Sequence, residues 1–309
     1  MAEVLKDIAK STGGTMRIFV TGATGFVGSA VVEELIGAGH QVLGLARSDA
    51  AADALKRMGA EVQRGDLSDP KGLSLAALEC DGVAHTAYNH DWSQIPAAAE
   101  MDRRVVEAFG EVLSRTGMPL VVTSAIGLLS PGRPTTEDDA GDPHSLGAVR
   151  IPSEEKALAL ASENVRSIII RLPPVVHDRT KQGLVTRMTA LARQTGASAY
   201  VQGGLNRWPA VHRRDAAQLF RLALEKGAPG SRYHAIAEDG IALRAIAEAI
   251  GKLVNVPAVS KTPEEAASHF GFLAYFISAD FQASSAKTKE ALGWNPTGTG
   301  LIADLEPAR

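Results

Sequence analysis

A glycine-rich stretch near the start of the chain has residue types and spacing suited to phosphate binding. The run 21–28 reads Thr-Gly-Ala-Thr-Gly-Phe-Val-Gly and lies between a β-branched run at 17–21 and a helical pattern at 25–38. Glycines at positions 22, 25 and 28 allow a tight turn, a close approach of the backbone to a pyrophosphate, and tight helix–sheet packing. The first N–H groups of the helix would point at the phosphates. We predict a dinucleotide-binding turn formed by Gly22, Thr24, Gly25, Phe26, Val27 and Gly28.

The end of the second predicted strand, at 41–46, indicates which nicotinamide cofactor is bound. A site for NAD usually places a carboxylate at this strand tip, where it binds the ribose hydroxyls. Here Arg47 and Ser48 follow the strand, and Asp49 comes later. Arg47 could pair with a 2′-phosphate and Ser48 could donate a hydrogen bond to it. We therefore predict NADP(H) rather than NAD(H).

The elements that must position this turn alternate between strands and helices. Short apolar runs and helical patterns alternate along 17–172, which predicts an α/β fold with a Rossmann-type, doubly wound parallel sheet. The domains expected are an N-terminal extension at 1–16, an NADP-binding Rossmann domain at 17–172 and a mostly substrate-binding region at 173–309, from which about 211–236 returns to the Rossmann domain.

Composition excludes several classes of function. The net charge of −3 gives no field to hold a phosphate backbone, so no nucleic-acid partner is expected. A single cysteine, Cys80, excludes a disulfide framework, and no ligand spacing suggests a metal site. No apolar run is long enough to span a membrane, and the N-terminus lacks the pattern of a secretory signal. We expect a cytoplasmic protein with a small-molecule substrate and no membrane partner.

The motif Thr-Gly-x-x-Gly-x-x-Gly resembles that of the extended short-chain dehydrogenase/reductase superfamily, which includes NAD(P)-dependent epimerases, dehydratases and carbonyl reductases. The runs Asp66-Leu67, His85-Thr86-Ala87, Thr123-Ser124-Ala125 and Arg171-Leu172-Pro173-Pro174 also resemble superfamily landmarks, and the likeness spans about 17–215. The resemblance implies cofactor contacts at Asp66, Leu67, Thr86, Ala87 and Pro173, and a catalytic serine at Ser124.

The Tyr-x-x-x-Lys helix of the superfamily has no full counterpart here. In the superfamily its tyrosine transfers a proton, and its lysine lowers the pKa of the tyrosine and holds the ribose. Aligned on Lys156, the tyrosine position holds Pro152. In one interpretation Lys156 keeps its cofactor role and another group, Tyr88, His90 or Asp91, supplies the proton. In a second the substrate, an iminium or an activated enone, accepts hydride without a strong donor, and in a third the protein binds NADP(H) without turnover. Tyr88 follows the fourth strand, at the edge where ligands bind in such sheets.

These features predict an NADPH-dependent oxidoreductase that reduces a small, largely apolar carbonyl or imine compound. Hydride would come from the nicotinamide, Ser124 would polarise the acceptor, and Tyr88 and Lys156 would complete the catalytic set. The alternatives are an epimerase or dehydratase acting on a nucleotide sugar, and a non-catalytic NADP-sensing regulatory protein. The helix expected at 97–115 has an apolar stripe that could pack in a homodimer or in the core of its own chain.

Overall fold

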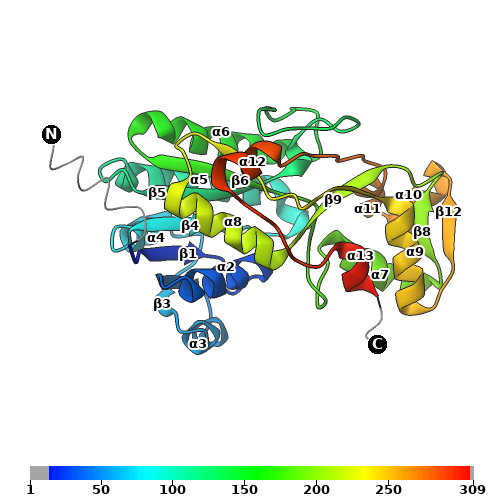
Figure 1. Ribbon diagram of the computed structural model, residues 1–309, viewed down its shortest axis with the longest axis horizontal. Helices are drawn as coiled ribbons and strands as arrows, with labels where there is room; N and C mark the ends of the chain where they lie inside the picture. Colours follow the sequence, from blue (N-terminus) through cyan, green and yellow to red (C-terminus); the bar gives the residue numbers. More distant parts are fainter. Residues whose placement is uncertain (1–13, 307–309) are drawn as a thin grey trace.

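A seven-stranded parallel sheet forms the centre of the molecule (Figure 1). The computed structural model describes residues 14–306, so most of the N-terminal extension lies outside the described residues. The strand order is β10-β6-β5-β4-β1-β2-β3, and all six neighbouring pairs run parallel. The strands are β1 (Arg17–Thr21), β2 (Gln41–Ala46), β3 (Glu61–Arg64), β4 (Gly82–His85), β5 (Pro119–Ala125), β6 (Arg166–Leu172) and β10 (Arg232–His234). The Rossmann-type fold class expected from the sequence is confirmed.

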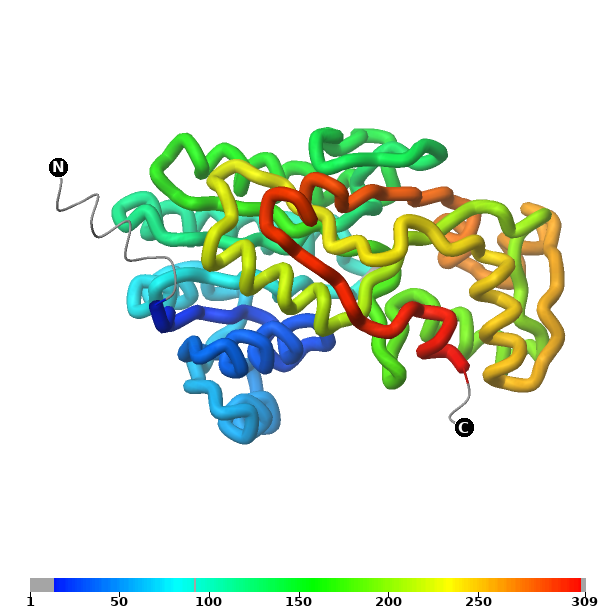
Figure 2. Tube along the Cα trace, in the orientation of Figure 1, coloured from blue at the N-terminus to red at the C-terminus, as the bar shows by residue number. Residues whose placement is uncertain are grey.

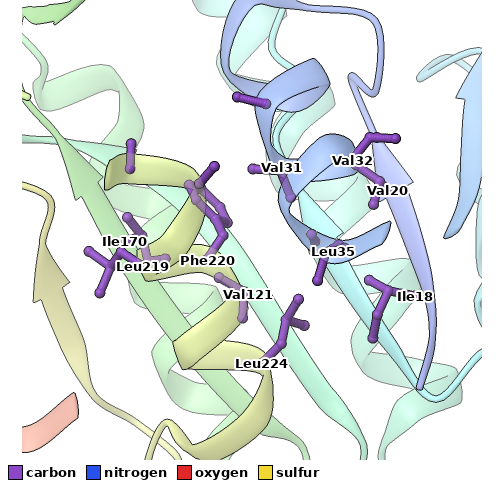
Figure 3. Packing of buried hydrophobic residues seen from close by; sticks show 14 of the residues in the cluster. Ile18, Val20, Val31, Val32, Leu35, Val121, Ile170, Leu219, Phe220 and Leu224 are labelled. Atoms are coloured by element: carbon purple, nitrogen blue, oxygen red, sulfur yellow. The ribbon is translucent and has the colours of Figure 1, made fainter. Parts of the chain in front are cut away.

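Helices cover both faces of this sheet because its strands are apolar on both sides. The helices on one face are α2 (Phe26–Gly37), α3 (Asp49–Arg57) and α8 (Arg213–Lys226), and those on the other are α4 (Pro70–Ala77), α5 (Ile95–Leu113) and α6 (Ile151–Ala159). Figure 3 shows the core of the first face, where α2 and α8 contribute Val31, Leu35, Leu219 and Phe220, and the strands contribute Ile18, Val121 and Ile170. In α5, Val105 and Phe109 are buried within the chain, so this part of its apolar stripe serves the chain's own core.

The rest of the chain forms a smaller lobe beside the carboxyl ends of the strands (Figure 2). Its three-stranded sheet comprises β7 (Val175–His177), β9 (Arg207–His212) and β11 (Glu238–Ala242), and its two-stranded sheet comprises β8 (Ser198–Val201) and β12 (Ala258–Lys261). Its helices are α7 (Leu184–Thr195), α9 (Leu243–Val254), α10 (Pro263–Phe270), α11 (Leu273–Ile277) and α13 (Leu301–Leu305), around a separate apolar cluster.

The chain crosses between the lobes more than once. After β9, the helix α8 and the strand β10 rejoin the main sheet, and α12 (Ala286–Leu292) later packs against both of them. Short 3₁₀ helices join several elements: η1 (Trp92–Gln94), η2 (Ile126–Leu128), η3 (Ala148–Arg150) and η4 (Leu160–Glu163). No helix between residues 14 and 306 combines the length and the apolar character needed to cross a membrane.

Candidate functional site

The glycine-rich turn has a geometry that side chains would disrupt. Gly22 follows β1 with φ +66°, and a Cβ there would lie 2.7 Å from the backbone nitrogen of Ala87. A Cβ at Gly28 would lie only 2.1 Å from the carbonyl oxygen of Gly22. The N–H of Gly25 donates to that same carbonyl at 2.8 Å, which closes the turn. This tight backbone fits the close approach of a dinucleotide diphosphate.

The start of α2 leaves backbone donors for such an anion. Gly25 provides no side-chain cap, and the first turn contains no acidic residue. Uncapped N–H groups and the helix dipole together favour a phosphate at this position. Thr24 and Gly25 are exposed, and Phe26 and Val27 are half-buried, so the predicted turn residues line an accessible surface.

The end of β4 is tied directly to this turn. The hydroxyl of Thr86 donates to the carbonyl of Thr21 at 2.6 Å, and the N–H of Ala87 donates to the hydroxyl oxygen of Thr21 at 3.3 Å. The structure therefore brings Thr86 and Ala87 to the glycine-rich turn. Tyr88 directly follows Ala87, so its backbone lies next to the glycine-rich turn.

The tips of β2 and β3 hold the groups predicted to contact the adenosine half of the cofactor. Arg47 is exposed, and its charge helps to lower the pKa of Asp66, although hydrogen bonds from Ser68 lower that pKa more. The hydroxyl oxygen of Ser48 caps α3 by accepting from the N–H of Ala51 at 3.2 Å, which leaves its proton free to donate. Asp49 pairs with Arg64. Leu67 is half-buried and packs against the apolar cluster on the face of the sheet covered by α4, α5 and α6. Pro173 is buried and lies between β6 and β7 in the sequence.

A cation and two rings gather at the carboxyl ends of β4 and β5. The guanidinium carbon of Arg150 lies 4.1 Å from the centre of the Tyr88 ring, and the ring of His90 meets that ring edge-on at 5.3 Å. Arg150 also donates from Nη2 to the carbonyl of Thr123, near the end of β5, at 2.8 Å. A cation over a tyrosine ring stabilises the packing and lowers the cost of forming a phenolate.

Asp102 of α5 forms an ion pair with Arg150. Its carboxylate lies 3.7 Å from Arg150 Nη2, accepts from the Ser153 hydroxyl at 2.5 Å and contacts His85 Nε2 at 3.1 Å. Burial alone would raise the pKa of Asp102, but the His85 hydrogen bond and the Arg150 charge together hold it below its ordinary value. The other ring nitrogen of His85 bonds to the hydroxyl of Thr21 at 2.7 Å. A buried polar chain therefore connects the glycine-rich turn to Arg150.

This environment sets the protonation of Tyr88 and His90. Burial raises the pKa of Tyr88, and the charge of Arg150 opposes that rise. Burial also lowers the pKa of His90, and Arg150 acts in the same direction. At neutral pH, Tyr88 therefore keeps its proton and His90 is neutral. A protonated tyrosine beside a cation is suited to act as a proton donor.

The predicted catalytic serine lies inside the protein. Strand alternation turns the side chain of Ser124 inward, whereas those of Thr123 and Ala125 are half-buried. Its hydroxyl oxygen is shielded from solvent and interacts with the carboxylate of Glu154, whose pKa it helps to lower. The residue before Ser124, Thr123, accepts a hydrogen bond from Arg150, which stacks on Tyr88. The role expected for Ser124 in polarising a substrate stays a prediction.

The predicted cofactor lysine forms an ion pair. Lys156 lies on α6 and pairs with Glu163 at 3.5 Å. The cation beside Tyr88 is instead Arg150, which ends η3 and immediately precedes α6. Sequence reasoning missed Arg150 and Asp102. The available signal was an acidic residue, Asp102, within an otherwise apolar stripe of a predicted helix.

No cluster of potential metal ligands occurs in the described residues.

Comparison with known proteins agrees with a dinucleotide-binding turn on a Rossmann-type sheet. The chain is 46% identical over 295 residues to an uncharacterized protein from Schizosaccharomyces pombe, which covers 94% of this chain and 98% of the relative. It is 28% identical over 264 residues to a 2-alkyl-3-oxoalkanoate reductase from Stenotrophomonas maltophilia, with coverage of 80% and 78%.

Its fold matches that of a nucleoside-diphosphate-sugar epimerase from Pseudomonas aeruginosa with a TM-score of 0.75 at 19% identity, covering 94% of this chain and 95% of the other. The family model for the NAD dependent epimerase/dehydratase family matches residues 18–236. Members of this family and its structural neighbours bind NAD(H) or NADP(H). The chain belongs to the NAD dependent epimerase/dehydratase family, within the extended short-chain dehydrogenase/reductase superfamily.

Proposed function

We propose that the protein is an NADPH-dependent oxidoreductase that reduces the carbonyl or imine carbon of a small, largely apolar compound. The observation that carries this proposal is the stacking of Arg150 on Tyr88, one residue after the Ala87 backbone that packs on the glycine-rich turn. The nicotinamide cofactor supplies hydride chemistry when it is bound. The chain's own residues supply binding, orientation and a proton.

Tyr88 donates its phenolic proton to the substrate oxygen or nitrogen. Its raised pKa keeps the proton in place until the substrate accepts it. The positive charge of Arg150 then stabilises the phenolate that is left. An epimerase or dehydratase reaction would instead begin with an oxidation in which the tyrosine acts as a base, and a raised pKa disfavours that role. This balance favours the reductive direction.

Arg47 and Ser48 provide the preference for NADPH in this proposal. Arg47 is exposed at the tip of β2, where its guanidinium can form a bidentate pair with a 2′-phosphate. Ser48 Oγ can donate to the same phosphate while it caps α3. The nearest following carboxylate, Asp49, pairs with Arg64 instead of remaining available for a ribose.

Exposed aromatic surface in the smaller lobe supports an apolar substrate. The charge of Arg187 of α7 helps to lower the pKa of His90, and the Arg187 guanidinium lies 5.6 Å from the ring centre of Phe272. Phe272 is 49% exposed, and its ring meets that of Phe276 edge-on, with 6.2 Å between the ring centres. A largely apolar compound would be favoured by such a surface.

The test is NADPH oxidation by the full chain with a panel of ketones, aldehydes, enones and cyclic imines. Turnover should occur with at least one class and fall about 10²–10⁴-fold in Tyr88→Phe, as expected for loss of a general acid. Tyr200→Phe is the matched control, because its ring is also stacked by an arginine, Arg244, at 5.8 Å. Equal turnover in wild type and Tyr88→Phe would overturn the assignment of the donor. Activity only on nucleotide sugars, or cofactor binding without any turnover, would overturn the proposed function.

A further inference from the structure

The loop at 178–183, directly after β7, is closed by its own hydrogen bonds and lies beside the glycine-rich turn. Asp178 shapes this loop, since Oδ1 of its side chain accepts from the N–H groups of Thr180 at 2.7 Å and Lys181 at 3.0 Å. The N–H of Asp178 donates to the Lys181 carbonyl at 2.9 Å. Gly183 ends the loop with φ +57°, and a Cβ there would lie 2.8 Å from the Pro174 carbonyl oxygen. The backbone of Lys181 is therefore held by local hydrogen bonds.

An ion pair fixes this loop to the elements that carry the turn. The second carboxylate oxygen of Asp178 lies 3.3 Å from Arg213 Nη1, at the start of α8. Arg213 also approaches Glu33 of α2 at 3.5 Å, and its guanidinium lies 5.2 Å from the ring centre of Phe26. Phe26 is the first residue of α2. The loop is thus anchored at the end of the helix where the uncapped N–H groups lie.

Lys181 presents an available positive charge at this position. Its Nζ lies 5.6 Å from the ring centre of Phe26, and its charge also reaches His90, whose pKa it helps to lower. The Lys181 side chain is exposed and forms no ion pair within residues 14–306. Arg213, on the same ring, is already paired with two carboxylates. Of the two cations at Phe26, Lys181 is the one whose charge is not balanced by a neighbour.

We propose that Lys181 binds the diphosphate bridge of the dinucleotide cofactor, with the 178–183 loop as its support. The glycine-rich turn 21–28 offers this diphosphate no charged side chain, so a side-chain cation adds a charge-assisted hydrogen bond. Because both NADH and NADPH contain the diphosphate, Lys181 contributes equally to the binding of each. Arg47 would act on the 2′-phosphate alone. The two cations therefore divide the recognition of the cofactor.

The experiment is a titration of binding, independent of turnover and so of the proposed reaction. Dissociation constants for NADPH and NADH are measured by cofactor fluorescence in wild type, Lys181→Gln and Arg179→Gln. Arg179 is the matched control, because it lies in the same loop, its side chain is 64% exposed, and its one ion pair within residues 14–306 is with Asp304, at 4.0 Å. Lys181→Gln should weaken the binding of both cofactors about tenfold and reduce the salt dependence of binding. Arg179→Gln should change neither the affinities nor the salt dependence.

A third ligand separates this role from the binding of the 2′-phosphate. Adenosine 2′-monophosphate carries that phosphate and no diphosphate, so its affinity should be unchanged in Lys181→Gln. Unfolding curves of the variant establish that it is folded. Unchanged affinity for both dinucleotides, or an effect confined to the substrate KM, would overturn the proposal. A loss for NADPH alone would also overturn it, because it would assign Lys181 to the 2′-phosphate.

Discussion

The Arg150 guanidinium stacks 4.1 Å from the centre of the Tyr88 ring while one of its nitrogens donates to the Thr123 carbonyl. One side chain therefore joins the loop after β4, the end of β5 and the start of α6. Asp102 and His85 continue this connection to Thr21 at the glycine-rich turn. The position of the cation thus depends on the same backbone that forms the cofactor site.

Replacing Arg150 should change both the rate and its pH dependence. Arg150 lowers the pKa of Tyr88, so its loss should raise that pKa further. If Tyr88 is the acid, activity declines on the basic side where the phenol loses its proton, and this limb should move to higher pH in Arg150→Gln. We expect kcat to fall about 10–100-fold, with partial recovery in Arg150→Lys. A profile of kcat against pH checks this, and an unshifted basic limb would contradict the pairing.

Glycine substitutions within one helix should separate the turn from the rest of α2. A Cβ at position 28 meets the Gly22 carbonyl oxygen at 2.1 Å, whereas one at Gly37 meets nothing within 4 Å. Gly28→Ala should therefore distort the turn and weaken the binding of both nicotinamide cofactors by more than tenfold. Gly37→Ala should leave binding unchanged and stabilise the protein by up to about 1 kcal/mol, through lower entropy of the unfolded chain. Cofactor titration and urea unfolding of both variants measure this, and equal effects would refute the steric argument.

The choice of cofactor should depend on Arg47. Arg47→Ala removes a guanidinium exposed at the tip of β2, where the 2′-phosphate would lie. We expect at least a tenfold loss of NADPH affinity and little change for NADH. Arg57→Ala, an exposed arginine at the end of the following helix, serves as the control. Comparable affinity for both cofactors in the wild-type protein would refute the preference for NADP(H).

The parts of the site that follow local patterns could be predicted from the sequence. The glycine-rich turn and the strands of the main sheet depend on nearby residues, and α2 was expected at 25–38 and forms at Phe26–Gly37. Arg150 could not be found in this way, because its place beside Tyr88 depends on the path of the long loop before α6.

The small sheet was missed for a related reason. The strand β7 has only three residues, Val175–His177, and its partner β9 begins about thirty residues later. A short run without local pairing gives no strand signal until its partner is known. Trp208 of β9 is fully buried in the core of the smaller lobe.

Stability should fall in mild acid because of His234. This side chain is fully buried, with Nδ1 bonded to the Ser284 carbonyl at 2.8 Å and Nε2 placed 3.3 Å from Arg171 Nη1. Nδ1 must therefore carry the proton, and Nε2 faces a cation as an acceptor. Burial, reinforced by the Arg171 charge, lowers the pKa of His234 from 6.5 to about 4. The folded protein resists protonation here, whereas the unfolded chain does not.

The unfolded state therefore binds more protons between about pH 6.5 and pH 4, and stability declines as the pH falls through that window. The full contribution is about 3 kcal/mol, from about 1.4 kcal/mol for each unit of pKa difference. Urea unfolding at pH 7.5 and pH 4.5 should show this loss in wild type. In His234→Gln the protein should be less stable at pH 7.5, but the loss between the two pH values should be smaller. An equal pH dependence in both proteins would mean that other groups, such as His90 or His212, cause the acid sensitivity.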